Sequence, residues 1–290
     1  MYKKKEIFDS EGDTAMHSAH RRYFTEFKDQ PLPLYMESVG YNPDQEAFVR
    51  PNGYNCYHWL QTVGGKGEFT MGGAKYVMEG GSGILLLPGE AHEYRPLEGK
   101  WQTYYMTFGG AQAGGILGTL GLPVSSYYGW DEAAELGGFV PGLLNRMSNE
   151  RDISGLSVSV EVYRFLTLLK KDGRVNRLPS LSNSVRRLTP VLEFLDRYYA
   201  DADIGLEDMA HRADITPRHL NTLFKQAFGM TAYAYLILLR LRKAKEMMTL
   251  HPRMTVKEVS GLVGFRDASH FVATFRKQEG VTPEQFRLLH

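Results

Sequence analysis

Polar side chains recur at helical spacing between Thr216 and Lys225. The apolar residues Leu220, Leu223 and Phe224 lie three and four positions apart, so they would share the buried face of a helix. The residues left on the opposite face are Arg218, Asn221, Thr222 and Lys225. Arginine can bind guanine and asparagine can bind adenine through paired hydrogen bonds, whereas lysine more often contacts phosphate. We therefore predict a helix that reads bases in a DNA major groove. A charged face that meets only solvent is the alternative.

A second stretch, around Phe271 and Phe275, repeats this design with a different outer face. The residues expected outside are Ser269, His270, Val272, Ala273 and Arg276. This set offers few strong donors to a base, although Val272 can meet a thymine methyl group. We expect the second helix to bind mainly through phosphates and DNA shape, while the first helix carries the sequence preference.

Both stretches belong to one layout that occurs twice between residues 206 and 287. Phe224 and Phe275 are 51 positions apart, whereas Leu206 and Val256, upstream of the turn, are 50 apart. A one-residue difference confined to the turn is what two helix-turn-helix units with unlike turns produce.

Short signals set the expected ends of these helices. The Thr-Pro pairs at Thr189 and Thr216 would each open a helix, because threonine caps it and proline suits its first turn. The expected capping boxes and C-terminal glycines are Thr255–Glu258, Thr282–Gln285, Gly229 and Gly280. Between the two units, Ala232–Met248 is expected to be one helix that holds their spacing.

From Leu34 to Phe108 the chain has a residue pattern typical of short strands. Apolar and aromatic runs of four to seven residues alternate with turn signals, which is typical of a small β-barrel or sandwich. The glycine pairs at residues 64–65, 72–73 and 80–81 are interpreted as turns between strands. In the last run, the two-residue period of a strand places Trp101, Thr103, Tyr105 and Thr107 on one side.

Two helices are expected after the strands, over Glu132–Asn149 and Leu156–Lys171. The apolar positions that would share one face of the second helix are Leu156, Val160, Tyr163, Leu166 and Leu169. Such a pair either covers the open end of a barrel or joins two copies of the chain. The polar segment from Lys171 to Ser184 has no periodicity and is predicted to be a linker.

The bulk properties fit a globular chain of two domains, because 290 residues exceed the usual size of one. Residues 185–290 hold 16 Lys and Arg against 12 Asp and Glu, whereas the rest hold 18 against 21, so the basic excess lies in the part predicted to bind DNA. The single cysteine, Cys56, excludes an internal disulfide and a Cys-rich zinc site. Without a signal-peptide pattern or a run of about 18 apolar residues, the protein is expected to be cytoplasmic, with no membrane partner.

Residues 204–288 resemble the DNA-binding domain of the AraC/XylS family of transcription regulators. The matching motifs are LEDMA from Leu206, TPxxLxxLFK from Thr216, YLxxxRLxxA from Tyr235 and GVTPxxFR from Gly280. One departure is Arg266, which stands where the family usually has a serine-like N-cap. We therefore expect Asp267 to cap the second recognition helix one position later.

Residues 48–110 are similar to the sugar-sensing cupin domain of the same family. The matching motifs are RP at Arg50, GKG ending at Gly67, GxxxxPGxxHxY from Gly83 and WxxxYxxF from Trp101. The resemblance implies a ligand-binding barrel followed by a helical dimerisation element. It carries onto pocket positions the residues Arg50, His58, Tyr94, Thr103 and Tyr105. Alternatively, these tyrosines are barrel core and the histidine is hydrogen-bonded there. Because Thr103 replaces a family histidine, the ligand need not be arabinose.

An enzyme is not indicated. Enzymatic cupins hold a metal with a His-x-His pair, a carboxylate and a further histidine. Here His92 matches the further histidine, but His58 has no partner histidine two positions away. No HExxH motif or Ser/His/Asp set is present. We therefore expect no catalytic residues, no metal and no other cofactor.

The sequence thus predicts a two-domain, homodimeric, ligand-responsive transcription regulator. A cupin-like β-barrel domain with following helices would occupy residues 1–170, a linker residues 171–184 and an all-α double helix-turn-helix domain residues 185–290. The expected partners are double-stranded DNA, a small effector for which a carbohydrate is favoured, and RNA polymerase, because activation is favoured over repression. The alternatives are a regulator that senses a non-sugar ligand or none, and a metal-dependent cupin enzyme fused to a helical module.

Overall fold

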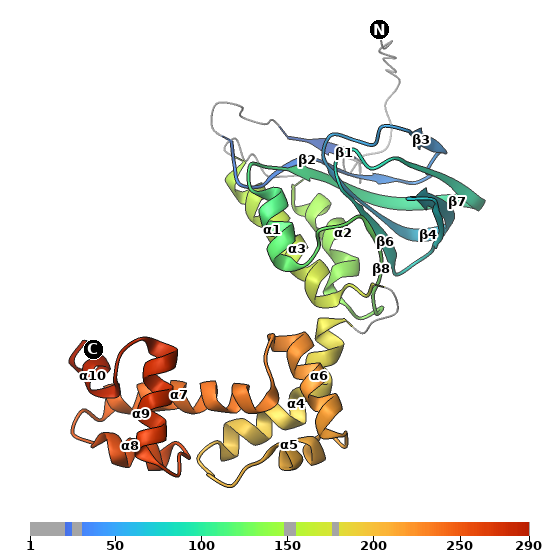
Figure 1. Ribbon diagram of the computed structural model, residues 1–290. Coiled ribbons are helices and arrows are strands. Elements are labelled where there is room, and N and C mark those ends of the chain that lie inside the picture. The colour runs from blue at the N-terminus through green and yellow to red at the C-terminus, as the bar shows by residue number, and fades with distance from the viewer. Residues whose placement is uncertain (1–20, 25–30, 148–154, 176–179, 290) are drawn as a thin grey trace. The chain divides into compact units, whose positions relative to one another are not determined.

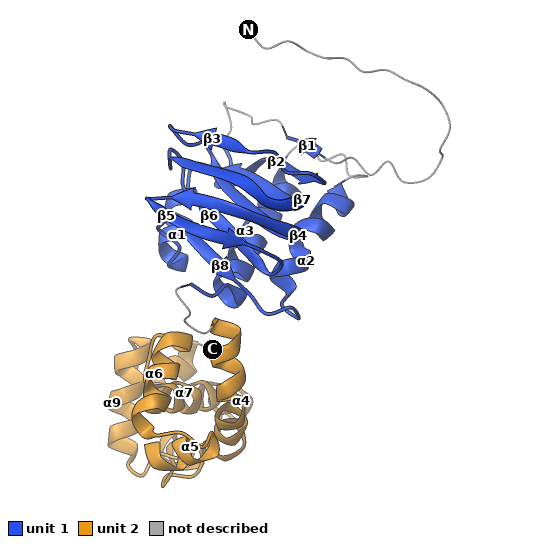
Figure 2. Ribbon diagram, turned by 90° about the vertical axis from the view of Figure 1, so that its right-hand side faces the viewer, with its two compact units in different colours: residues 1–178 blue, residues 179–290 orange. Residues whose placement is uncertain are grey.

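The computed structural model describes residues 21–24, 31–147, 155–175 and 180–289. The chain divides into two compact units, residues 1–178 and residues 179–290, coloured blue and orange in Figure 2. Helix occupies both ends of the predicted linker, because α3 (Leu156–Asp172) reaches past Lys171 and α4 (Leu181–Tyr198) begins before Ser184. Residues 171–172 and 181–184 of the predicted linker are therefore helical.

Unit 1 is built on an antiparallel sheet, which confirms the prediction of a β-rich N-terminal domain (Figure 1). The strands are β1 (Arg21–Tyr23), β2 (Tyr35–Asn42), β3 (Phe48–Arg50), β4 (Tyr57–Met71), β5 (Ala74–Met78), β6 (Ser82–Leu86), β7 (His92–Gly109) and β8 (Ser126–Gly129). Their order is β1-β2-β7-β4-β6-β8, with β3 paired to β7 and β5 paired to β4. The long strands β4 and β7 therefore hold the sheet together.

β4 is long because the Gly64-Gly65 pair bends the strand instead of ending it. The pairing register with β7 shifts on both sides of Gly64, and Gly65 has φ +70°. A side chain at Gly65 would place its Cβ 2.1 Å from the carbonyl oxygen of Lys100. The prediction of a turn here was wrong, because glycine serves a β-bulge as readily as a turn. The other two glycine pairs do form turns.

The helices α1 (Ala113–Leu120), α2 (Glu135–Met147) and α3 cover one face of this sheet (Figure 1). The core between helices and sheet contains Trp59 of β4, Phe108 of β7 and Phe165 of α3, all of them fully buried. The Trp59 and Phe165 rings meet edge to face with their centroids 5.2 Å apart. The helical pair predicted after the strands therefore covers the sheet, whereas α1 and β8 were not predicted.

The buried face predicted for α3 is only partly confirmed: Leu166 and Leu169 are buried as predicted, whereas the other three positions are not. Leu156, Val160 and Tyr163 are 59%, 67% and 49% exposed. The residues that pack against the sheet are Val158, Val162, Phe165, Leu166 and Leu169. Both sets follow steps of three and four along the helix, so periodicity alone could not separate the inner stripe from the outer one.

Unit 2 is helical and contains the two predicted helix-turn-helix units. Its helices are α4, α5 (Leu206–Arg212), α6 (Pro217–Phe228), α7 (Ala232–Leu250), α8 (Val256–Leu262), α9 (Ala268–Glu279) and α10 (Pro283–Leu289). Helices α5 and α6 form the first helix-turn-helix unit, α8 and α9 form the second, and α7 joins them (Figure 1). Each unit has its own cluster of buried apolar residues.

Most of the predicted helix ends are confirmed. The hydroxyl of Thr216 accepts the N–H of His219 at the start of α6, and Asp267 accepts the N–H of Ser269 at the start of α9. Gly229 and Gly280 end these helices at φ +71° and +79°, a conformation that glycine adopts without strain. Both capping boxes are also present.

One predicted helix start was wrong, because Thr189 and Pro190 lie inside α4. The cap is Ser180, whose hydroxyl accepts the N–H of Asn183. Leu188 lies before the proline yet is buried in the same cluster as Val191. Burial of this residue extends the helix upstream of the proline, at the cost of one backbone hydrogen bond.

A buried arginine connects the two helix-turn-helix units. Arg240, in the middle of α7, is only 3% exposed. Its guanidinium donates to the carbonyl oxygen of Tyr199 at 2.8 Å and to that of Asp201 at 2.7 Å. Tyr199 itself packs against both apolar clusters. The end of α4 is thereby tied to the middle of α7.

In the part of the chain that the structure describes, no helix is both long and apolar enough to cross a lipid bilayer.

Candidate ligand cavity and DNA-binding helices

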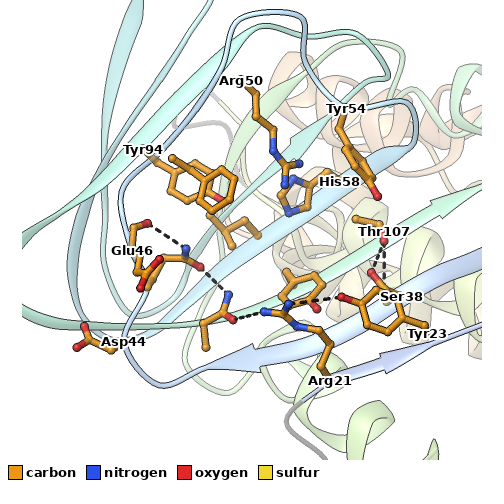
Figure 3. Close-up of a pocket in the computed structure, with 15 residues that line it drawn as sticks. Arg21, Tyr23, Ser38, Asp44, Glu46, Arg50, Tyr54, His58, Tyr94 and Thr107 are labelled. Carbon is orange, nitrogen blue, oxygen red and sulfur yellow. Dashed lines mark hydrogen bonds between the residues drawn. The ribbon is translucent and has the colours of Figure 1, made fainter. Parts of the chain in front are cut away.

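A cavity of about 410 Å³ lies on the side of the sheet opposite the fully buried Trp59 and Phe108 (Figure 3). Its wall comes from β1, β2, β3, β4 and β7 and from the loop between β2 and β3. Strand alternation separates the two sides, because Trp59 faces the helices while His58 and Leu60 face the cavity.

Most of the residues predicted to bind a ligand line this cavity, namely Arg50, His58, Tyr94 and Tyr105. Thr103 does not, because it is fully buried and its hydroxyl donates to Oε1 of Gln45 at 2.8 Å. The strand period gave Thr103 the correct side of β7, but Gln45 covers it. Its prediction as a ligand residue is corrected accordingly.

Sequence reasoning missed many of the lining residues. They are Arg21, Tyr23, Ser38, Asn42, Asp44, Gln45, Glu46, Phe48, Tyr54, Leu60 and Thr107. Thr107 could have been named, because it shares the predicted side of β7 with Tyr105. The others come from β1, β2, β3 and β4 and from the segments on either side of β3, which only the folded sheet brings together.

Hydrogen bonds hold the loop that forms one wall of the cavity. Gln45 accepts from Nδ2 of Asn42 at 2.7 Å, and its own amide donates to the carbonyl oxygen of Glu46 at 3.1 Å. Asn42 in turn accepts from the guanidinium of Arg21 at 3.1 Å. These amide groups already have protein partners, so they shape the wall.

Two buried histidines lie near each other in unit 1: His58 lines the cavity, and His92 lies beside it outside the lining. Burial, aided by the nearby Arg50 guanidinium, lowers the pKa of His58 to about 3, and burial also lowers the pKa of His92. Both imidazoles are therefore neutral near pH 7. Nδ1 of His92 lies 2.7 Å from the carbonyl oxygen of Glu90, so it carries the proton. Among the described residues, Nδ1 of His58 and Nε2 of His92 have no hydrogen-bond partner.

The two imidazole rings are 6.1 Å apart. Within the described ranges, however, no three His, Cys, Asp or Glu residues gather closely enough to hold a metal ion. Burial also raises the pKa of Tyr105 to about 12, so its hydroxyl stays protonated. The arrangement can offer hydrogen bonds and aromatic faces to a small molecule.

On α6, Arg218, Thr222 and Lys225 are exposed, as predicted. Asn221 is only half-exposed, and its Oδ1 accepts the backbone N–H of Ala232 at 3.0 Å. Paired hydrogen bonding to adenine needs both the acceptor and the donor of the amide. The predicted bidentate contact from Asn221 therefore does not fit this geometry. Its partner is the first residue of α7, and no local sequence pattern predicts this contact.

On α9, Ser269, His270, Ala273 and Arg276 are exposed. Val272 is half-buried and packs against the apolar cluster of the second unit, so its predicted outward position was wrong. The ring of His270 lies edge-on to Phe265 with the centroids 5.6 Å apart. The exposed face of α9 thus has even fewer base-reading groups than predicted.

Two family descriptions match this chain. The AraC-like ligand binding domain matches residues 35–166, and the helix-turn-helix domain matches residues 209–288. The HTH-type transcriptional activator RhaS of Escherichia coli strain SE11 is 29% identical over 145 residues, which are 50% of this chain and 50% of that protein. The same activator from Escherichia coli O1:K1 gives the same figures. The chain spans about half the length of the curated relatives it matches.

Solved structures are similar to part of this chain. The C-terminal domain of the response regulator yesN from Fusobacterium nucleatum is 28% identical, with 33% of this chain and 93% of that chain covered and a TM-score of 0.32. The C-terminal domain of the response regulator AraT from Geobacillus stearothermophilus is 27% identical, with 38% and 88% covered and a TM-score of 0.35.

The depressed pKa of His58 predicts a pH-dependent stability. A histidine whose pKa falls on folding contributes stability that is complete above its unfolded pKa of 6.5 and is lost as the pH falls toward 3. When the pH is lowered from 6.5 to 5, the free energy of unfolding of the wild type is expected to fall by about 1–2 kcal/mol more than that of His58→Asn. Urea unfolding at a series of pH values measures this difference. The exposed-site variant His251→Asn should keep the wild-type profile, and a His58→Asn profile parallel to the wild type would contradict the assignment.

Proposed function

We propose that this chain, which belongs to the AraC/XylS family of transcription regulators, senses a small carbohydrate in unit 1 and thereby controls DNA binding by unit 2. The matched ligand-binding domain lies in unit 1 and the matched helix-turn-helix domain lies in unit 2. The chain is thus an AraC-type DNA-binding regulator with a ligand-binding domain, and its matched families are those of regulators rather than enzymes.

The observation that supports a carbohydrate is the mixture of aromatic faces and polar groups around the cavity. The rings of Tyr54, Tyr94 and Tyr105 line it, and so do the hydroxyls of Ser38 and Thr107. A sugar presents hydroxyl groups at its edge and apolar C–H groups on its faces, so it can use both kinds of wall. The volume, about 410 Å³, is in the range of small-molecule sites.

A thermal-shift screen of sugars tests this proposal, because a ligand that binds only the folded state raises the melting temperature. For a sugar found in this way, Tyr105→Ala is expected to weaken binding about three- to tenfold, since an aromatic face is lost. Calorimetric titration measures the affinity. Tyr104→Ala is the matched control, because the neighbouring residue points to the other side of β7. Aromatic acids as the only hits would favour the non-sugar alternative.

For DNA recognition, the supporting observation is the exposed face of α6. It presents Arg218, Thr222 and Lys225 together, and neither cation has an ion-pair partner among the described residues. We assign base contact to Arg218 and phosphate contact to Lys225. On α9, Ser269, His270, Ala273 and Arg276 are assigned to the DNA-facing surface, with Arg276 at a phosphate.

The two helices predict different mutant phenotypes. Arg218→Ala is expected to relax the base preference at one position of the DNA site. The binding free energy for the preferred site should weaken by about 1–3 kcal/mol. Arg276→Ala is expected to weaken all sequences alike and to reduce the salt slope of binding by about one. Binding-site selection and salt titrations measure these effects, with each variant serving as the control for the other. An unchanged selected motif for Arg218→Ala would contradict its role.

We further assign a homodimer to this chain, on the basis of the outer face of α3. Leu156, Val160 and Tyr163 form an exposed apolar stripe, which in a twofold-symmetric dimer would be buried against its own copy.

Val160→Glu is expected to convert the dimer to a monomer, because it places a charge in the middle of the stripe. Sedimentation equilibrium gives the mass. Thr119→Glu, at an exposed position on α1, should leave the mass unchanged. A wild-type protein that is monomeric at all concentrations would contradict the proposed homodimer.

A relative at 29% identity is named a transcriptional activator, so we propose activation, with RNA polymerase as the partner. Transcription in a purified system containing the polymerase and a selected site should rise when the regulator and its ligand are added. A fall would indicate repression.

A further inference from the structure

Arg50 holds its guanidinium in a fixed plane at the cavity. It ends β3, and its guanidinium carbon lies 4.7 Å from the ring centre of Tyr54 and 5.2 Å from that of Phe48. Such contacts restrict the side chain and leave the N–H groups at its edge directed elsewhere. Figure 3 shows the guanidinium directed into the cavity beside His58.

Arg50 has no protein acceptor in the part of the chain that the structure describes. The carboxylate of Glu37 does not pair with Arg50; it accepts a hydrogen bond from the hydroxyl of Tyr54 at 2.5 Å. The other arginine of the cavity, Arg21, donates to Asn42 at 3.1 Å. Of the two arginines that line the cavity, Arg50 is the one whose guanidinium has no hydrogen bond to a described residue, so all of its donors remain for a ligand.

The polar side chains that line the cavity beside Arg50 carry no negative charge, and Glu37, which accepts the Tyr54 hydroxyl, does not line the cavity. Ser38 and Thr107 share a hydrogen bond at 2.6 Å, and His58 is a neutral imidazole whose Nδ1 has no partner among the described residues. The positive charge of Arg50 is one cause of that neutrality. This end of the cavity is positive and supplies donors.

The opposite end is negative. Asp44 and Glu46, from the loop between β2 and β3, also line the cavity, and both are exposed. Figure 3 shows Asp44 away from Arg50, at the other end of the cavity. Carboxylates accept hydrogen bonds and repel anions, so they suit the hydroxyl groups of a ligand.

We propose that the effector is a sugar acid, a hexuronate or an aldonate, whose carboxylate pairs with Arg50 and whose hydroxyl groups lie toward Asp44 and Glu46. This inference rests on the proposed carbohydrate-sensing function. A neutral hydroxyl accepts a single hydrogen bond from an arginine and leaves its charge in place, whereas a planar carboxylate accepts two parallel hydrogen bonds and neutralises the charge. A phosphate dianion fits less well, because one arginine balances only half of its charge.

The test compares matched ligands. The wild-type protein is titrated calorimetrically with hexuronates and aldonates and with the neutral sugars of the same stereochemistry. The acid of the best pair is expected to bind about 10- to 100-fold more tightly than its neutral partner. Its affinity should also fall as salt is added, whereas that of the neutral sugar should not.

Arg50→Gln, which keeps a planar donor without the charge, is expected to bind both members of the pair alike. The matched control is Arg95→Gln, the same substitution on an arginine of β7 that pairs with Glu68 and does not line the cavity, and it should keep the preference for the acid. Because the salt dependence is measured on the wild type, the test does not depend on the folding of a variant.

The outcomes separate the two proposals. A neutral sugar that binds as tightly as its acid, or a sugar phosphate that binds more tightly, overturns the sugar-acid inference and leaves carbohydrate sensing intact. Binding of neither neutral nor acidic sugars overturns carbohydrate sensing itself, and the inference with it.

Discussion

The pairing of β4 with β7 is the constraint on which unit 1 depends. Their register runs from Tyr57 opposite Phe108 to Met71 opposite His92, and it fixes which side chains point to each face. Along this pair, Trp59 and Phe108 enter the core under the helices, while His58 and Tyr105 point to the cavity. A slip of one residue would exchange the two faces, so the core and the cavity are specified by one register.

The bulge at Gly64 and Gly65 lets this long ladder bend, and the pairing resumes in a shifted register from Gly67 to Met71. The bent sheet brings the short strand β3 against β7, where Arg50 pairs opposite His92. The cavity therefore collects residues from distant parts of the sequence through backbone pairing alone. Its charge pattern, with Arg50 at one end and Asp44 at the other, follows from which loops the sheet places there.

In unit 2, the corresponding constraint is α7. Arg240 donates to the end of α4, Tyr199 packs against both apolar clusters, and Asn221 ties α6 to the first residue of α7. A buried charged side chain stabilises a structure only when its donors are all used. These contacts explain how two separate cores share one helix and how that helix sets the spacing of α6 and α9.

The sequence predicted what local patterns determine. The paired helix-turn-helix units, the caps at Thr216 and Asp267 and the helix-ending glycines all depend on neighbouring residues. Prediction from the sequence failed where a structure depends on a contact with a residue far away along the chain. Packing against the sheet decides which face of α3 is buried. The side-chain oxygen of Asn221 accepts the backbone N–H of Ala232 at the start of α7. Most of the cavity escaped prediction for the same reason, since β1 and the loop before β3 carry no pattern of their own.

The account depends on communication between the cavity and the DNA-binding helices. The most direct test measures the affinity of the full chain for a selected DNA site, by fluorescence anisotropy, with and without a saturating cavity ligand. With the acidic ligand at a concentration that saturates the wild type but not Arg50→Gln, this affinity is expected to change in the wild type and to change less in the variant. DNA binding by the wild type that is identical with and without the bound ligand would contradict it.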